Sequence, residues 1–234
     1  MGKEIRLDIA GTTYREDSIY VKPVTRRRVM GDTPEVGKCY MGELTVTLTI
    51  PSSSIPRNAE IKPYIRDSNG TWKQKSVFNV FSRSVDRVTG YVTLNAYDAI
   101  FKAEQSFTQP GNQGQWPRDD KVVMQEIATR TNTTICSDSL ALMDAINTAT
   151  GSYYKVQYPG IKTSDGTLKP DGQGALTMRD VAGRIAGFYG GNWYIDDNGQ
   201  WRLWQFGVIP ADADYLVTED PAIIVMGGVR ILVK

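Results

Sequence analysis

The chain has 234 residues, and 41% of them are hydrophobic, which is enough to bury a core without disulfides or metals. Lys and Arg total 27 against 26 Asp and Glu, so the formal net charge of +1 provides no overall field that would gather nucleic acid or an anionic membrane. No apolar run approaches the roughly 20 residues needed to span a bilayer, and the polar start of the chain lacks a secretory signal. We therefore expect synthesis in a cytoplasm, with no membrane insertion and no nucleic-acid sequence recognition.

The chain contains no histidine. Histidine is the side chain best suited to proton transfer near neutral pH and the commonest zinc ligand, so most catalytic triads and transition-metal sites are excluded. Cys39 and Cys136 have no spaced partners, and we expect two buried free thiols. Acidic residues near the C-terminal end lack EF-hand spacing and are expected in surface turns: Asp196, Asp197, Asp212 and Asp214. The sequence thus predicts no metal, no cofactor and no catalytic residue.

Short strands are predicted throughout residues 1–108. The pattern is clearest at 44–50, where aliphatic residues alternate with Thr45, Thr47 and Thr49, and Asn69-Gly70 favours a hairpin turn. This density of strands predicts an antiparallel β-barrel or sandwich. The predicted strands are 3–10, 18–24, 44–50, 61–66, 71–75, 76–81, 85–88 and 91–96.

Residues 91–107 change their hydrophobic period in the middle. A two-residue alternation up to Ala96 is followed by helical spacing of Ile100, Phe101 and Glu104, so a strand should run directly into a short helix. Asp98 stands at the junction, where its side chain can accept hydrogen bonds from unpaired amides of the first turn. We expect a helix cap with no other role.

The loop before residue 44 superficially matches a phosphate-binding motif. It has five residues between Gly31 and Gly37 where that motif has four, and Cys39 stands in place of the Ser or Thr that binds magnesium. It also leads into a strand, so no helix amino terminus would cradle a phosphate. An ordinary loop is predicted.

Residues 109–220 are predicted to form a small α+β domain after a turn-rich connector at 109–117. Its two main helices should begin at Asp119 or Asp120 and at Thr177, where Asp180 completes a capping pair. A weaker helical stretch covers 139–146, and one strand is expected within 153–158. Segments 193–195 and 201–206 should pair as a hairpin around Asn198-Gly199. Residues 221–234 alternate as one strand that closes the first barrel or opens a second.

Trp193, Trp201 and Trp204 lie close together in the sequence. Strand alternation places Trp193 and Trp201 on the face that packs on the helix containing Val181, whereas Trp204 points the other way. Core packing is the preferred interpretation. The alternative is that the three indoles stack on a glycan.

Partner contacts are predicted at two places. Arg26, Arg27 and Arg28 form the one basic cluster, which marks either a solvated edge or a contact for an acidic partner surface. The second is the stretch 151–174, a long loop, because long loops without internal structure inside compact domains tend to have a function or to be disordered.

Several segments together resemble a known family. These are GKCYMGELTVTLTIP, EIKPYIRD, GYVTLNAYDAIFKAEQSF, a helix beginning near DDKVVMQEIATRTN, and LTMRDVAGRIAGFYGGNWYIDDNGQWRL. In this succession the chain resembles the amino-terminal part of tail proteins from phages and prophages of Gram-positive bacteria, which are similar to baseplate hubs and tail-tip proteins. The most specific pieces are the strand-to-helix AYDA segment and the helix-GG-N-W hairpin, and neither is a catalytic signature.

The resemblance implies a structural role. It implies a β-barrel domain and an α+β domain in a homotrimeric ring that joins the tail tube to a spike, fibre or lysin, within the virion tail. Two alternatives from other classes remain at this stage. One is a cell-wall carbohydrate-binding module that uses the tryptophans, and the other is a hydrolase that uses two carboxylates, one with a raised pKa.

Overall fold

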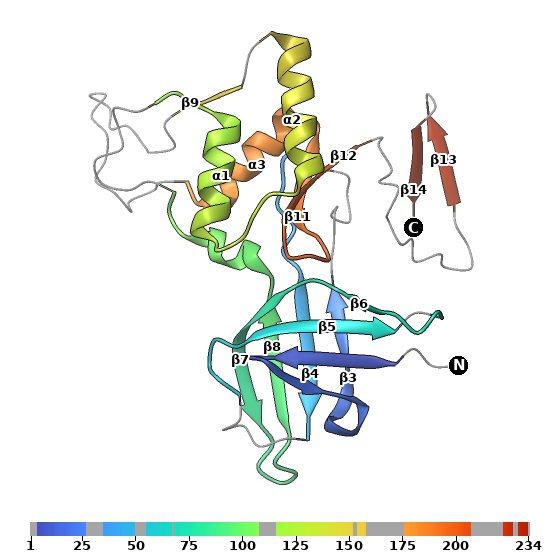
Figure 1. The fold of residues 1–234 in the computed structure, drawn as a ribbon. Helices are drawn as coiled ribbons and strands as arrows, with labels where there is room; N and C mark the ends of the chain where they lie inside the picture. Colours follow the sequence, from blue (N-terminus) through green and yellow to red (C-terminus); the bar gives the residue numbers. More distant parts are fainter. Residues whose placement is uncertain are drawn as a thin grey trace.

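In a computed structural model, the chain folds into a sheet unit and a helical unit that lie end to end (Figure 1). The structure describes residues 4–26, 35–49, 55–66, 68–107, 116–151, 154–157, 176–206, 222–226 and 229–233, with backbone alone for 23–26 and for the last two ranges. Among these residues, no helix is long and apolar enough to cross a membrane.

The sheet unit is one antiparallel eight-stranded sheet in the order β2-β1-β5-β7-β8-β4-β3, with β6 paired to β5. A short 3-10 helix, Glu16–Ser18, precedes β3. The strands are β1 Ile5–Ile9, β2 Thr12–Tyr14, β3 Ile19–Arg26, β4 Glu43–Leu48, β5 Glu60–Arg66, β6 Trp72–Gln74, β7 Phe78–Val85 and β8 Val92–Tyr97.

The sheet folds over on itself, so that β1 and β5 lie across the face formed by β3, β4, β7 and β8 (Figure 1). The enclosed core is aliphatic, and the inward residues of β4 that alternate with its threonines are all buried. This burial of one face per strand is what the two-residue period predicted. The central buried residues are Leu7, Ile9, Leu44, Val46, Leu48, Ile61, Phe78, Val92 and Leu94.

The predicted barrel is not confirmed. In the described part of the chain, β2 and β3 end the sheet, and no strand pairing joins them. A closed barrel and an open sheet folded over one core both bury one face of each strand. The alternation of apolar and polar residues therefore fits either architecture.

The helical unit contains a short 3-10 helix, three α-helices and two small two-stranded sheets, β9 with β10 and β11 with β12. The β-rich α+β class is confirmed. The elements are η3 Ala99–Glu104, β9 Arg118–Asp119, α1 Asp120–Arg130, α2 Ser137–Thr150, β10 Lys155–Val156, α3 Met178–Phe188, β11 Gly191–Ile195 and β12 Trp201–Gln205.

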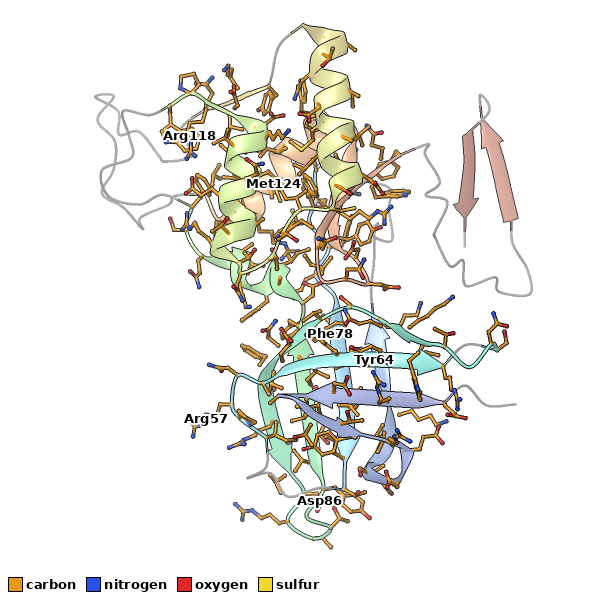
Figure 2. The ribbon with its side chains drawn as sticks, in the orientation of Figure 1. Arg57, Tyr64, Phe78, Asp86, Arg118 and Met124 are labelled. Atoms are coloured by element: carbon orange, nitrogen blue, oxygen red, sulfur yellow. The ribbon has the colours of Figure 1, made fainter. Side chains whose placement is uncertain are left out.

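The helix α3 organises the second core. Thr177 and Asp180 form a reciprocal capping box at its start, as the sequence predicted. Its buried stripe includes Val181 and Ile185 and packs on β11. Met124 of α1 lies inside the same unit, whereas Phe78 lies at the end of the sheet unit nearest to it (Figure 2).

Three sequence expectations are corrected by the structure. The stretch predicted as a weak helix at 139–146 is a full helix of 14 residues, α2, so the described residues hold three α-helices rather than two main ones. In place of the predicted strands 76–81 and 85–88 there is one strand, β7, which spans 78–85, and residues 86–88 lie in the turn that follows it. Residues 221–234 contain two paired strands, β13 Ala222–Met226 and β14 Val229–Val233. The Gly-Gly between them is a hairpin signal that the apolar alternation concealed.

The sequence did not predict strand β2. This strand pairs with β1 through a tight turn in which Ala10 has φ 49° and Gly11 has φ 85°. Positive φ at both central residues is the requirement of a type I′ turn, which usually carries Asn-Gly or Asp-Gly. The Ala in the first position therefore hid the hairpin.

This turn generates a stability prediction. Ala10→Asn should raise the free energy of unfolding by about 0.5–1 kcal/mol, because Asn adopts positive φ with less strain than Ala. Gly11→Ala should lower it by about 1 kcal/mol through backbone strain alone, since a Cβ at this position would have no atom within 4 Å. Urea unfolding followed by circular dichroism measures both. Effects of the same sign in the two variants would contradict the turn assignment.

Candidate functional site at the junction of the two units

Among the described residues, the chain crosses between the two units at two adjacent points, around Gly42 and around Asp98. The Asp98 side chain is buried and bridges them: Oδ2 accepts from the Gly42 amide at 2.6 Å, and Oδ1 accepts from the Ile100 amide at 2.9 Å. The Asp98 amide donates to the Gly42 carbonyl at 3.0 Å. Asp98 is therefore the helix cap that the sequence predicted and, in addition, the link between the two crossings.

Residues 35–41 precede β4 in the sequence but belong to the helical unit in space. Backbone amides of Gly37 and Tyr40 donate to the carbonyls of Gly191 and Trp193, and the Trp193 amide donates to the Lys38 carbonyl, all at 2.9 Å. The segment thus runs parallel to β11 as an added edge strand. The loop predicted before residue 44 is a structural component of the second core.

Side chains fix this segment further. The buried Asn192 amide group accepts from the Lys38 amide at 2.9 Å and donates to the Glu35 carbonyl at 2.8 Å. Arg179 of α3 donates through Nε to the Cys39 carbonyl at 3.0 Å and also pairs with Glu104 of η3. The segment is therefore held from the hairpin, from α3 and from η3.

The segment approaches α3 at two glycines. A Cβ at Gly183 would lie 2.6 Å from the Gly37 carbonyl oxygen, whereas a Cβ at Gly187 would lie 3.4 Å from Gly37 Cα. The small-residue face of α3 was visible in the sequence as Gly183 and Gly187 four residues apart. It gave no sign of a contact, because its partner lies about 150 residues earlier in the chain.

A third contact joins the units through the β11–β12 turn. The Asp197 carbonyl accepts from the Ser76 amide at 3.1 Å and from Gln74 Nε2 at 2.7 Å. The Lys75 ammonium lies 3.3 Å from the Asp197 carboxylate, and Gly199 faces Val77. The Asn198-Gly199 turn predicted from the sequence therefore docks on the loop between β6 and β7.

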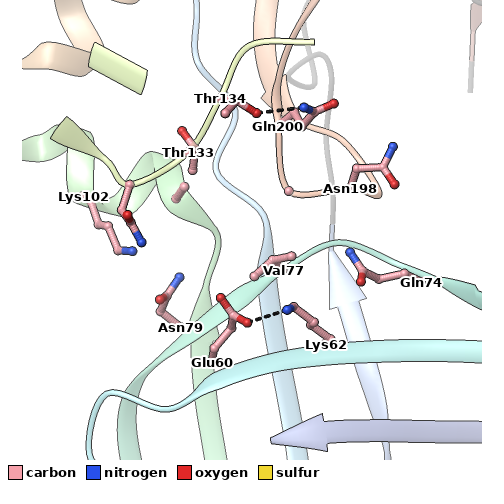
Figure 3. A pocket seen from close by; sticks show the side chains of 13 residues that line it. Glu60, Lys62, Gln74, Val77, Asn79, Lys102, Thr133, Thr134, Asn198 and Gln200 are labelled. Atoms are coloured by element: carbon pink, nitrogen blue, oxygen red, sulfur yellow. Dashed lines mark hydrogen bonds and ion pairs between the residues drawn. The ribbon is translucent and has the colours of Figure 1, made fainter. Parts of the chain in front are cut away.

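Between these contacts lies an open cleft of about 640 Å³ to which many polar side chains contribute (Figure 3). The sheet side contributes Glu60, Lys62, Gln74, Val77 and Asn79, and η3 contributes Ala99 and Lys102. The opposite side is formed by 132–134 and 198–200. Lys62 is ion-paired with Glu60 at 2.8 Å. The cleft exists because both units supply a wall, which the sequence could not indicate.

Of the residues singled out from the sequence as partner or glycan contacts, none that the structure describes lines the cleft. Arg26 ends β3, and its side chain, like Arg27 and Arg28, lies outside the described residues, as does most of 151–174. Trp193 and Trp201 are each 0% exposed and pack edge to face in the core of the helical unit. Fully buried indoles offer no face to a glycan. Trp204 is half-buried and contacts the Phe206 ring.

One carboxyl in the described residues has the raised pKa that the hydrolase alternative requires. Burial raises the pKa of Asp120, whose carboxylate accepts from the Tyr189 hydroxyl and from the Lys121 amide. Asp120 is 0% exposed, and it does not line the cleft. Its environment is therefore that of a core hydrogen-bond acceptor without access to a substrate.

The two cysteines are free and buried, as the sequence predicted. Burial strongly raises the pKa of the Cys39 thiol. Because the thiolate is the reactive form, this burial disfavours reactivity of Cys39, whose side chain packs in the core of the helical unit.

No family model and no curated protein matches the chain. Among solved structures, the 43 kDa tail protein of prophage MuSo2 from Shewanella oneidensis superposes with a TM-score of 0.54 at 13% identity, over 90% of this chain and 58% of that one. A tail protein from Neisseria meningitidis MC58 gives a TM-score of 0.44 at 12% identity, over 87% of this chain and 50% of that one. The fold is thus similar to that of a prophage tail protein, and the chain spans little more than half of that protein's length.

The Asp98 bridge generates a prediction. Asp98→Ala should lower the free energy of unfolding by about 3 kcal/mol, because it removes a helix cap and leaves a buried amide without an acceptor. Asp86→Ala is the matched control: its carboxylate also accepts from two amides, those of Val88 and Thr89, but at an exposed turn at the far end of the sheet unit (Figure 2). Denaturant unfolding should show a clearly smaller loss there, because solvent can replace the Asp86 carboxylate as acceptor at an exposed turn. Equal losses would refute a special role for Asp98.

The close contact between Gly37 and Gly183 generates a further prediction. Gly183→Ala should destabilise the protein by about 1–3 kcal/mol, because its methyl group would overlap the backbone of Gly37. Gly187→Ala should be neutral or slightly stabilising, since ordinary contact is preserved and Ala favours the helix. Thermal unfolding compares the two. If Gly183→Ala unfolds at the wild-type temperature, the segment is not held against α3.

Proposed function

We propose that the chain is a structural component of a phage or prophage tail, located in the tail tip or baseplate hub. The single observation that carries this proposal is the fold shared with the MuSo2 tail protein over 90% of the chain. The segments of sequence that resemble tail proteins provide independent support. In this role the chain would join the tail tube to a spike, fibre or lysin.

The finer part of the proposal is assembly into a homotrimeric ring. A cyclic arrangement uses two different patches of each copy heterologously and requires units that keep a fixed relative orientation. The three contacts at the junction support such rigidity: the Asp98 bridge, the added strand 35–41 and the docking of Asp197. The proposal assigns these residues a scaffold role with no bond-breaking reaction.

Two measurements test the proposal. Light scattering with negative-stain imaging should show particles of three times the 26.0 kDa chain mass with a central hole. Antibody against the chain should label one end of the tail in particles induced from the bacterium that encodes it. A chain absent from purified particles would overturn the tail assignment, whereas a labelled tail with a different copy number would overturn the trimer alone.

A further inference from the structure

The cleft between the units contains polar side chains that the fold does not use. Asn79 and Lys102 on one wall and Asn132 and Asn198 on the other have no side-chain partner among the described residues, although all four line the cleft. Gln200, by contrast, donates to Thr134 Oγ1 at 2.8 Å. Unused amide groups that converge from two walls indicate a site for a ligand with many hydrogen-bonding groups.

An exposed aromatic cluster adjoins this cleft. It consists of Phe81, Tyr97 and Phe101, whose ring centroids lie 5.0–5.4 Å apart. Tyr97 is the register partner of Asn79, and Phe101 precedes Lys102, so both rings border residues of the cleft. Phe81 is 58% and Phe101 is 38% exposed. The cluster therefore provides apolar surface at the edge of a polar cleft.

Phe81 projects from the outer face of β7, as the alternation along this strand requires: Phe78 and Val80 are buried, and Phe81 is exposed beside Tyr97. The pairing of β7 with β8 shifts by one residue between Val80 and Ser82, so a β-bulge lies at the same place. The sheet thus departs from regular pairing at the point where it presents an aromatic ring to solvent.

We propose that the cleft binds an oligosaccharide. Each sugar hydroxyl both donates and accepts, as each Asn amide group does, and the apolar face of a sugar ring packs on exposed aromatic rings. The volume of about 640 Å³ lies within the range of small-ligand pockets.

Other ligand classes fit less well. A nucleic acid would need several unpaired cations, and Lys62 is neutralised by Glu60, which leaves Lys102. An extended peptide would add to an open strand edge, but Asn79 is paired on both sides, with Glu60 and with Tyr97. The cleft offers side-chain amides instead, and the aromatic cluster lies beside it. The inference does not rest on the proposed tail function.

The test is an array of oligosaccharides with neutral hexoses, N-acetylated hexosamines and uronic acids, probed with the labelled full chain. Binding to at least one class is expected, and calorimetry with that oligosaccharide gives the affinity. Asn79→Ala combined with Asn132→Gly should weaken it about tenfold or more. Glycine suits position 132 because Asn132 has φ 58°, so the backbone is preserved. Phe101→Ala should also weaken binding.

Asn69→Ala is the matched control, because it removes an amide group from the β5–β6 loop, outside the residues that line the cleft. It should bind as the wild type does, and circular dichroism should show all variants folded. The proposal is overturned if no oligosaccharide on the array binds, if binding persists unchanged in the Asn79/Asn132 variant, or if a library of unstructured peptides binds and no oligosaccharide does.

Discussion

The buried carboxylate of Asp98 is the interaction on which the arrangement of the two units depends. The crossings at Gly42 and at Asp98 meet at this side chain, because one of its oxygens accepts from Gly42 and the other from Ile100. A charged acceptor bound to two backbone amides in a buried position is among the strong hydrogen-bonding arrangements of proteins. A side chain at position 42 would displace it, since a Cβ there would lie 2.7 Å from Oδ2. The pair Gly42 and Asp98 thus sets the geometry of the junction.

The second constraint is that a segment between two strands of the sheet unit packs in the helical unit. Residues 35–41 leave the sheet after β3, complete the edge of the β11–β12 hairpin, and return to form β4. Cys39 is part of the helical core, although both flanking strands belong to the sheet. This packing couples the folding of the two units, because the second core is incomplete without a part of the first segment. The two units are therefore joined by packing and hydrogen bonds as well as by the chain.

The fixed arrangement of the two units forms the cleft. Its walls come from the sheet, from η3 and from two loops of the helical unit, and each wall is held by the contacts that orient the units. A preorganised cleft loses little entropy on ligand binding. The same fixed arrangement suits a scaffold that must present fixed surfaces to neighbouring molecules. A structural role and a binding site in the cleft are compatible for this reason.

Several features were determined by the sequence itself. These features depend on neighbours a few residues away or on the burial of one face. They are the alternation in β4, the capping box of Thr177 and Asp180, the Asn198-Gly199 turn, and the burial of Trp193 and Trp201. Hidden signals caused the local errors: Ala10 replaced the usual turn residue, and apolar residues masked the hairpin of β13 and β14.

Tertiary structure alone decided the remaining features. Each of them depends on residues that are distant in the chain. Examples are the order of the strands in the sheet, the hydrogen bond from Gly42 to Asp98, the contact of Gly37 with Gly183, and the placement of Asn79 and Asn132 in one cleft. Periodicity reports which face of an element is buried, but not which distant element covers it. The junction is built from such pairings, and so its chemistry became visible only when both units were placed together.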